Sequence, residues 1–338
     1  MSTRTGSTGT VSTVAVLGAG SWGTALAHLA AQGGHEVRLW SHEAEGAAQL
    51  KHDGENRRYL PGISLRDIAV SADLGAILKG AQWIVSAVPC AGVPALTGDV
   101  AALCEADAVV ISGTKGLHPQ TGARSAQMWG AHFGPQRYVA LSGPNLAREI
   151  AFGVPTSTVV ASHSDETATR AQELFASRQF RVYSNTDLIG VELGGALKNV
   201  VAIAAGICDG LGFGDNAKAA IMTRHWREMT RLAMAQGARE STLFGLSGIG
   251  DLFATCASPH SRNHSLGTKL GRGESLRQAQ SEVAQVAEGV HTTKAALRLS
   301  QVCNVELPVT QQLADLLFDG KDVRHAVEAL MGRQGCAE

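Results

Sequence analysis

The sequence lacks the marks of several common classes of protein. Its six cysteines are scattered and no two form a C-x-x-C pair, which argues against a disulfide framework and a zinc site. Its histidines show no metal-ligand spacing such as H-E-x-x-H, so we predict no metal. No apolar run of about 18 residues occurs, so we expect no membrane span. Residues 1–12 contain no apolar segment typical of a secretory signal, and we expect a cytoplasmic protein.

An excess of charge of one sign is also absent. Lys and Arg together number 29, Asp and Glu number 30, and the formal net charge is -1. This balance argues against a strongly basic nucleic-acid-binding protein, and we expect no nucleic-acid partner. Hydrophobic residues make up 44% of the 338 residues, which excludes disorder of the whole chain and indicates about two domains.

The first half of the chain alternates short β-branched runs with helical stretches, which is typical of a parallel, doubly wound sheet. The predicted strands are Thr13–Leu17, Glu36–Trp40, Ile68–Ser71, Trp83–Val88, Ala108–Ser112, Tyr138–Ser142, Thr156–Ala161 and Phe180–Tyr183. The predicted helices among them include Trp22–Gln32, Ala91–Glu105 and Gln120–Ala131.

Strand patterns disappear after Asp187, and helical periodicity takes over. The predicted helices there are Leu188–Cys208, Ala217–Gln236, Ser275–Val286, Thr292–Cys303, Val309–Phe318 and Val323–Met331. We therefore predict a flexible tail over residues 1–12, a Rossmann-like dinucleotide-binding domain over residues 13–185, and an all-helical substrate domain over residues 186–338.

A glycine-rich turn follows the first predicted strand. Gly18, Gly20 and Gly23 form a G-x-G-x-x-G pattern that opens a helix, with Ser21 and Trp22 inside it. In this position glycines permit a tight turn and a close approach of the backbone to a pyrophosphate, which the helix N-terminus stabilises. The pattern alone is weak, because a plain structural turn can also carry it, but its context predicts dinucleotide binding.

The end of the second predicted strand should select between NAD and NADP. NAD-selective sites favour an acidic residue there, since a carboxylate binds the ribose hydroxyls and repels a 2′-phosphate. The strand here ends at Trp40, followed by Ser41 and His42, with Arg38 nearby and Glu43 only beyond. This favours NADP slightly; the alternative is that these are ordinary surface residues.

Three later segments concentrate polar groups in apolar surroundings. Lys115 and Gly116 follow one predicted strand, and Gly143 and Asn145 follow another, where ligands lie in open α/β sheets. Lys198 stands in a predicted helix made otherwise of Gly, Ala, Val, Ile and Leu. Such a lysine either extends to solvent or is desolvated, and desolvation lowers its pKa towards a range useful for proton transfer.

The second half holds a further polar group. Asp251 follows a Gly-Ile-Gly turn and precedes Ser261, Arg262 and Asn263. An arginine offers a planar fork of donors, so the Arg262–Asn263 pair suits anion recognition, and a solvated loop is the alternative. Glu288 further on gives little information by itself.

Taken in this order, these segments resemble the bacterial-type NAD(P)-dependent glycerol-3-phosphate dehydrogenases. The matching pieces are GAGSWGTALA (18–27), TKGL (114–117), LSGPN (141–145), ELGGALKNVVAIAAGICDGLGFGDNAKAAIMTR (192–224), GLSGIGDLFATC (245–256), SRN (261–263) and VAEG (286–289). The long block and the GDL…SRN pair are highly specific, whereas the glycine turn is not.

The resemblance implies reversible reduction of dihydroxyacetone phosphate to sn-glycerol 3-phosphate, a backbone for glycerophospholipid synthesis. It implies that Lys198 is the proton donor and acceptor. The implied substrate contacts are Lys115, Gly143, Asn145, Lys198, Asp251, Ser261, Arg262 and Asn263. The implied cofactor contacts are Gly18, Gly20, Ser21, Trp22, Gly23, His42, Lys115, Ala147, Arg262, Val286 and Glu288.

The sequence departs from the family at three places. Asn145 stands where Ser or Thr is usual, His264 stands where Arg or Lys is common, and VPCAG (88–92) replaces a VPS-type segment. Two other functions stay open: a dehydrogenase of 3-hydroxy acids, and a non-catalytic NAD(P) sensor that would not need Lys198. For partners we expect the small-molecule substrate, with a homodimer as a candidate assembly.

Overall fold

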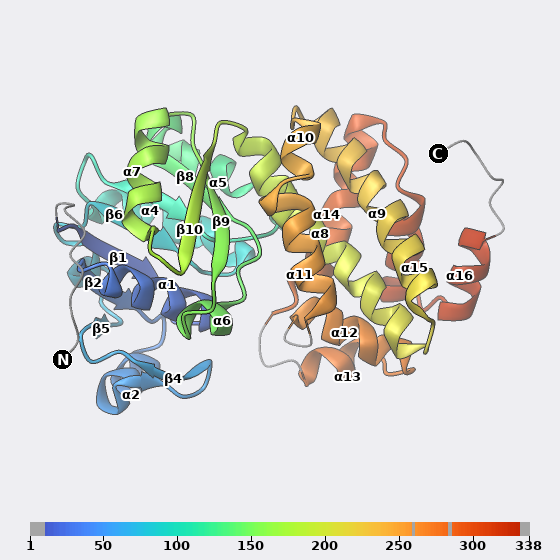
Figure 1. Ribbon diagram of the computed structural model, residues 1–338, viewed down its shortest axis with the longest axis horizontal. Coiled ribbons are helices and arrows are strands. Elements are labelled where there is room, and N and C mark those ends of the chain that lie inside the picture. Colours follow the sequence, from blue (N-terminus) through green and yellow to red (C-terminus); the bar gives the residue numbers. More distant parts are fainter. Residues whose placement is uncertain (1–10, 259–260, 283–285, 332–338) are drawn as a thin grey trace. The chain divides into compact units, whose positions relative to one another are not determined.

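The computed structural model describes residues 11–258, 261–282 and 286–331 (Figure 1). The chain divides into two compact units, which are Met1–Thr114 with Ser125–Val191, and Lys115–Arg124 with Glu192–Glu338. The second unit thus takes in Lys115–Arg124, a short segment that lies within the predicted dinucleotide-binding domain of residues 13–185.

Eight strands of the first unit form one sheet in the order β10-β9-β8-β7-β6-β1-β2-β5. They are β1 (Thr13–Leu17), β2 (Glu36–Trp40), β5 (Ala69–Ser71), β6 (Trp83–Ser86), β7 (Val109–Ser112), β8 (Tyr138–Ser142), β9 (Thr156–Ala161) and β10 (Phe180–Asn185). Every neighbouring pair is parallel except β8 and β9. The predicted mostly parallel, doubly wound sheet is therefore confirmed.

The central strands are buried on both faces, which explains their uninterrupted apolar sequences. Val14–Leu17 of β1 are fully buried, and their alternate side chains join a cluster with α1, α6 and α7. The helices of this unit are α1 (Ser21–Gln32), α2 (Ala44–Asp53), α3 (Leu74–Leu78), α4 (Val93–Leu103), α5 (Ser125–Phe133), α6 (Ala147–Ala151) and α7 (Asp165–Phe175), with 3₁₀ turns at Cys90–Gly92 and Pro135–Arg137.

The strand order places the glycine turn at the topological switch point of the sheet. β1 pairs with β2 on one side and with β6 on the other, and the chain then continues outward to β7 and β8. In open α/β sheets, ligands bind outside the carboxyl ends of the strands at this point. A small antiparallel pair, β3 (Glu55–Asn56) with β4 (Leu60–Ser64), was not predicted, because Pro61 and Gly62 interrupt its strand pattern.

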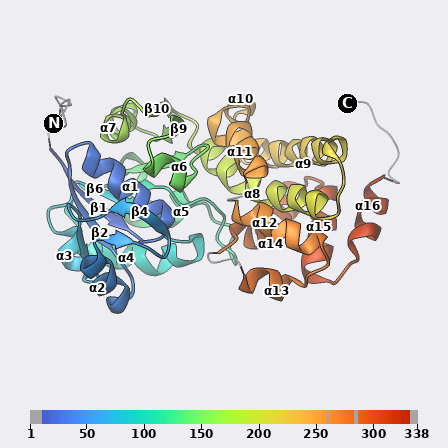
Figure 2. The ribbon, with the colours of Figure 1, turned by 60° about the horizontal axis from the view of Figure 1, so that its bottom comes forward.

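From Leu188 onward the described elements are all helices or helical turns, as predicted (Figure 2). They are α8 (Leu188–Gly210), α9 (Asp215–Ala235), α10 (Glu240–Leu243), the π-helical turn η3 (Leu246–Gly250), α11 (Asp251–Ala257), α12 (Arg262–Gly271), α13 (Leu276–Ser281), α14 (Glu288–Cys303), α15 (Pro308–Phe318) and α16 (Val323–Met331). The helix predicted over Ser275–Val286 is observed only to Ser281, and residues 283–285 lie outside the described residues.

Helix α8 is long and apolar enough to cross a membrane by length and composition, but 89% of its most apolar window is buried in the structure. It packs against α12 through glycines spaced four residues apart on both helices. A Cβ at Gly206 would lie 2.1 Å from the carbonyl oxygen of His264, and one at Gly267 would lie 2.1 Å from that of Ile203. These positions let the two backbones touch, and the contact fixes Lys198 on α8 relative to the start of α12.

Candidate active site

The glycine turn of the first unit has the geometry of a dinucleotide-binding loop. Gly18 has a φ of +105°, which favours glycine, and its amide donates to the carbonyl of Trp40 at 3.1 Å. A Cβ at Gly23 would lie 1.8 Å from the carbonyl oxygen of Gly18, so the helix can pack on the turn only with glycine there. A Cβ at Gly20 would meet no protein atom within 4 Å, so the protein itself does not require glycine at that position.

These features fit a bound pyrophosphate. Gly20 caps α1 without a side-chain hydrogen bond, and the first turn of α1 contains no acidic residue. The backbone amides that open a helix have no acceptor within the helix, and they favour a negative charge. A small residue at Gly20 leaves the backbone open to such a group, which accounts for the glycine that the protein's own packing does not demand.

Neighbouring side chains hold this turn in place. The indole of Trp22 donates to the carbonyl of Gly113 at 3.2 Å, and Trp22 and Ala147 both pack on the apolar cluster that contains Ala25. The amide of Asn56 donates to the carbonyl of Ala19 at 2.9 Å. Asn56 was not predicted, because only its burial in the structure distinguishes it from an ordinary loop asparagine.

The end of β2 presents His42 and not Arg38. His42 is exposed, and its ring lies edge-on to Trp40 with a centroid distance of 5.6 Å. The guanidinium of Arg38 binds Glu36 at 2.7 Å and donates to the carbonyls of Ala76 and Lys79. Arg38 is therefore engaged by its own unit, whereas His42 and the following Glu43 are exposed.

The segment after β8 has a constrained backbone. Gly143 has a φ of +150°, and a Cβ there would lie 3.0 Å from Cα of Thr158. The amide nitrogen of Asn145 donates to the Thr158 hydroxyl at 3.0 Å, and that hydroxyl donates to the carbonyl of Ser142. Among the described residues the Asn145 side-chain oxygen is buried without a partner. Asn145 thus offers an acceptor oxygen and a second amide N–H, where the usual Ser or Thr offers a single hydroxyl.

The second unit brings two lysines onto one carboxylate. Nζ of Lys198 donates to Oδ1 of Asp251 at 2.9 Å, and Nζ of Lys115 donates to Oδ2 at 2.7 Å. The side chain of Lys198 is 8% exposed, that of Lys115 is 16% exposed, and that of Asp251 is 3% exposed. Two ammonium groups on one carboxylate leave one net positive charge in a nearly dry environment, which favours an anionic ligand.

Burial lowers the pKa of Lys115 to about 8, even though Asp251 opposes this shift. The ammonium of the nearby Lys198 lowers the pKa of Lys115 further, and so does the guanidinium of Arg262. The positive charge of Lys115 therefore depends on pH within the range in which enzymes are usually assayed.

Thr255 belongs to the same cluster and was missed from the sequence. Its hydroxyl accepts from Nζ of Lys198 and donates to Oδ1 of Asp251 at 3.2 Å. Thr255 lies one helical turn after Asp251 on α11, so the spacing of four residues was the available signal. An ammonium has three N–H donors, and Asp251 and Thr255 take two of those on Lys198. The third is suited to a substrate oxygen.

The start of α12 carries the predicted anion-binding residues. Ser261 caps the helix and accepts from the amide of His264. Nη1 of Arg262 donates to the carbonyl of Val286 at 2.9 Å, which takes one of the five N–H donors of the guanidinium. Glu288 opens α14, two residues after Val286.

Asn263 holds helices together. Its amide nitrogen donates to Oδ1 of Asn199 on α8 at 2.9 Å, and its oxygen accepts from the amide of Gly289 on α14 at 2.9 Å. The buried side chain thus links three helices. His264, which replaces a usual Arg or Lys, binds Oδ2 of Asp209 at 2.7 Å.

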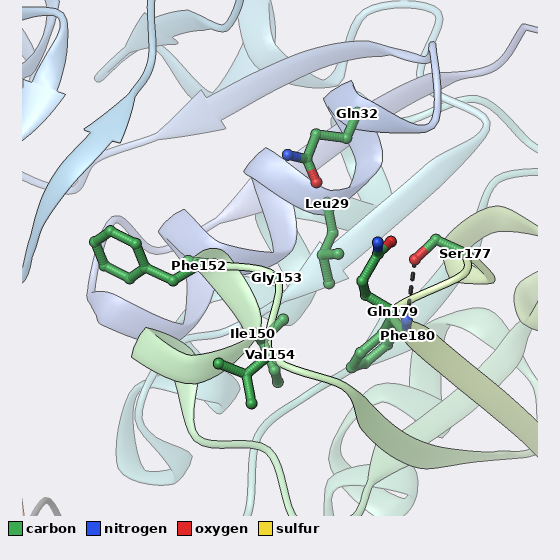
Figure 3. A pocket seen from close by; sticks show the side chains of 10 residues that line it. Leu29, Gln32, Ile150, Phe152, Gly153, Val154, Ser177, Gln179 and Phe180 are labelled. Carbon is green, nitrogen blue, oxygen red and sulfur yellow. Dashed lines mark hydrogen bonds between the residues drawn. The ribbon is translucent and has the colours of Figure 1, made fainter. Parts of the chain in front are cut away.

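A hollow of about 380 Å³ lies elsewhere in the first unit, among α1, α6 and the turn before β10 (Figure 3). The hydroxyl of Ser177 at its wall accepts from the amide of Phe180 at 3.0 Å. Its lining residues are Leu29, Gln32, Ile150, Ala151, Phe152, Gly153, Val154, Ser177, Gln179 and Phe180. None of the predicted site residues is among them. The described residues also contain no group of three or more His, Cys, Asp or Glu that could hold a metal ion.

Comparison with known proteins gives a consistent result for both units. Residues 13–168 match the family described as NAD-dependent glycerol-3-phosphate dehydrogenase N-terminus, and residues 187–328 match the corresponding C-terminus. The chain is 46% identical over 324 residues to the glycerol-3-phosphate dehydrogenase [NAD(P)+] of Geobacillus kaustophilus, covering 95% of this chain and 94% of that protein. It is 44% identical over 329 residues to the enzyme of the same name from Citrifermentans bemidjiense, covering 96% and 98%.

Solved structures agree. The crystal structure of glycerol-3-phosphate dehydrogenase from Coxiella burnetii matches with a TM-score of 0.91 and 38% identity, over 96% of this chain and 99% of that one. The family match spans most of both units, and it includes the glycine turn of the first and the lysine–aspartate cluster of the second. This chain belongs to the NAD(P)-dependent glycerol-3-phosphate dehydrogenases, a family of oxidoreductases.

Proposed function

We propose that this protein catalyses the reversible reduction of dihydroxyacetone phosphate to sn-glycerol 3-phosphate with NAD(P)H. The observation that carries the proposal is the buried Lys198–Asp251–Lys115 cluster, in a chain of this family. A ketone reductase must provide a proton to the carbonyl oxygen as hydride reaches the carbon, and it must bind the phosphate.

Lys198 is the proposed proton donor. Bound NAD(P)H would supply the hydride, and the residues of the glycine turn would hold its pyrophosphate. As negative charge develops on the carbonyl oxygen, the Lys198 ammonium stabilises it and delivers a proton. In the reverse direction, neutral Lys198 accepts the hydroxyl proton. Asp251 and Thr255 orient Nζ through the two hydrogen bonds described above.

Arg262 and Lys115 are the proposed groups for the phosphate end of the substrate. A guanidinium provides paired N–H donors for phosphate oxygens. The ammonium of Lys115, in the same unit as Arg262, adds a second positive charge that attracts the phosphate. Binding energy from a phosphate remote from the reacting carbon can then be used to orient that carbon. Asn145 would contribute an acceptor for a substrate hydroxyl.

The proposed cellular role is the supply of glycerol 3-phosphate for glycerophospholipid synthesis in the cytoplasm. The cysteines among the described residues are free thiols, which fits a reducing compartment. The function is tested by assaying the purified protein with NADH and NADPH against dihydroxyacetone phosphate, and with NAD+ and NADP+ against a panel of 3-hydroxy acids. Turnover of the hydroxy acids alone would identify a different dehydrogenase, and cofactor binding without any turnover would identify a sensor.

Cofactor choice gives one prediction. We expect the wild-type protein to use NADPH at least as well as NADH, because no carboxylate stands at the end of β2 and exposed His42 does. His42→Asp should shift the ratio of kcat/KM towards NADH, since a carboxylate repels the 2′-phosphate yet still binds ribose hydroxyls. His132→Asp, at an exposed position on α5, makes the same charge change and should leave the ratio unchanged. A wild-type protein that ignores NADPH would show that another residue sets the preference.

The depressed pKa of Lys115 gives a second prediction. Below pH 8 its ammonium is charged, and as pH rises through about 8 it loses its proton, so positive charge at the substrate site falls. We therefore expect KM for dihydroxyacetone phosphate to rise above pH 8. Lys115→Arg keeps the charge throughout this range and should abolish that rise. If the rise persists unchanged in Lys115→Arg, another group is responsible.

A further inference from the structure

The segment Lys115–Arg124, which we call the strap, connects β7 to α5. Both of those elements belong to the first unit, whereas the strap belongs to the second. Its flanking residues are fixed in the first unit, since the hydroxyl of Thr114 donates to the carbonyl of Val88 at 2.9 Å and the hydroxyls of Ser112 and Ser125 lie 2.7 Å apart. Its position within the second unit depends on its own contacts there.

Charged side chains bind the strap at its start, its middle and its end. Lys115 binds Asp251 of α11 at 2.7 Å, and Arg124 binds Glu192 of α8 at 2.6 Å. Between them, Arg298 of α14 donates to the carbonyls of Pro119 and Gln120. Three different helices of the second unit thus hold one short segment.

The Arg124–Glu192 ion pair is largely buried, so its loss should cost more stability than the loss of an exposed pair. Its side chains are 16% and 7% exposed, so water screens the attraction little. Exposed ion pairs contribute little, but removing one partner of a buried pair leaves an uncompensated charge. Glu192 also lies on the helix that carries Lys198, so α8 determines the position of both the proton donor and the far end of the strap.

The strap is compact enough to transmit this constraint. The amide of Gly122 donates to the carbonyl of His118, and the amide of His118 donates to that of Ala123, both at 2.9 Å. The ring of His118 also accepts from the amide of Thr121 at 3.2 Å. These hydrogen bonds close residues 118–123 into one turn, through which we expect a displacement of Arg124 to reach Lys115.

Building on the proposed function, we propose that Arg124 and Glu192 are positioning residues that hold the Lys115 ammonium on Asp251, and that Arg298 supports them at the middle of the strap. Neither Arg124 nor Glu192 is assigned a contact with substrate or cofactor. Their effect passes through the strap. Loss of the pair lets Lys115 move away from Asp251 into solvent, while the Lys198–Asp251–Thr255 contacts remain.

The test compares Glu192→Gln with wild type in steady-state kinetics over a range of pH. We expect KM for dihydroxyacetone phosphate to rise roughly tenfold, the size of a coupling between contacting groups, with a much smaller change in kcat. The rise of KM in wild type near pH 8 should move to higher pH, because Lys115 becomes better solvated. Arg124→Lys keeps the positive charge, so its KM for dihydroxyacetone phosphate should lie between those of wild type and Glu192→Gln.

Controls separate positioning from general stability. Lys321→Gln breaks a partly exposed ion pair with Asp315, 3.6 Å long, at a different place in the second unit, and should leave KM and its pH dependence unchanged. Arg298→Gln changes an exposed residue, so it should fold even if Glu192→Gln does not, and should raise KM in the same direction by less. A folded Glu192→Gln protein with a lower melting temperature but wild-type KM and pH dependence would overturn the proposal.

A readout without turnover keeps this proposal separate from the proposed function. Hydrogen exchange of the amides in residues 116–124 should be faster in Glu192→Gln than in wild type, with helix α9 unaffected. Absence of dihydroxyacetone phosphate turnover in wild type would contradict the proposed function alone. Unchanged exchange in the strap would contradict the positioning role alone.

Discussion

Lys198→Ala is expected to lower kcat by about 10²–10⁴, the usual contribution of a positioned general acid–base group. The substitution removes the buried ammonium that Asp251 and Thr255 orient, so the developing charge on the carbonyl oxygen meets no proton donor. Affinity for NADPH should survive, because the glycine turn belongs to the other unit and is unchanged. Stopped-flow measurement of NADPH oxidation, with cofactor binding measured separately, checks both parts.

The matched control is Lys218→Ala on α9. That lysine also pairs with an aspartate, Asp209, at 2.9 Å, but it is not part of the Asp251 cluster. Its loss should leave kcat close to that of wild type. Turnover of Lys198→Ala at the wild-type rate would show that the proton comes from another group.

Arg262→Ala is expected to raise KM for dihydroxyacetone phosphate by about 10- to 150-fold, corresponding to roughly 1.5–3 kcal/mol for a charge-assisted hydrogen bond. Unphosphorylated dihydroxyacetone lacks the group that the guanidinium binds, so its kcat/KM should change far less. The measurement is the ratio of kcat/KM for the two substrates in each protein. A lower affinity for NADPH would fit the cofactor contact that the family resemblance implies for this residue.

Arg272→Ala provides the control for charge. Arg272 is exposed at the opposite end of the same helix, α12, and should leave both substrates unaffected. If Arg262→Ala lowers kcat/KM equally for the two substrates, Arg262 does not bind the phosphate. Its bond to the carbonyl of Val286 would then be its main role.

The overall architecture could be predicted because each of its main elements has a local signal. Buried parallel strands are continuous β-branched runs, and α8 and α9 are long enough to show a clear helical period. The β3–β4 pair and helices α10, α11 and α12 were not predicted. They are short or rich in Gly, Ser and Thr, so tertiary contacts rather than propensity stabilise them.

The glycine spacing between α8 and α12 illustrates the same limit. Gly206 and Gly210 face Gly267 and Gly271, and side chains at these positions would collide with the opposite backbone. Nothing in either helix alone shows which helix it will contact. The reason for these glycines becomes visible only in the packed structure.

In the candidate site, too, some residues could be predicted from the sequence and others could not. A lone lysine in an apolar helix marked Lys198, and the hypothesis that Asp251 orients it fits their separation of 2.9 Å, although the catalytic roles stay predictions. Thr255 and the Arg124–Glu192 pair went unnoticed. Arg124 and Glu192 lie 68 residues apart in the sequence, and so distant a pair leaves no periodic signal. Thr255 lies four residues after Asp251, but its contact with Lys198 spans 57 residues.

The central claim is that this chain reduces dihydroxyacetone phosphate. The most direct test incubates the purified protein with NADPH and dihydroxyacetone phosphate and quantifies sn-glycerol 3-phosphate against NADPH consumed. The account predicts one molecule of sn-glycerol 3-phosphate for each NADPH oxidised, and a rate that collapses in Lys198→Ala. A folded wild-type protein that binds NADPH or NADH and forms no glycerol 3-phosphate with either would contradict it.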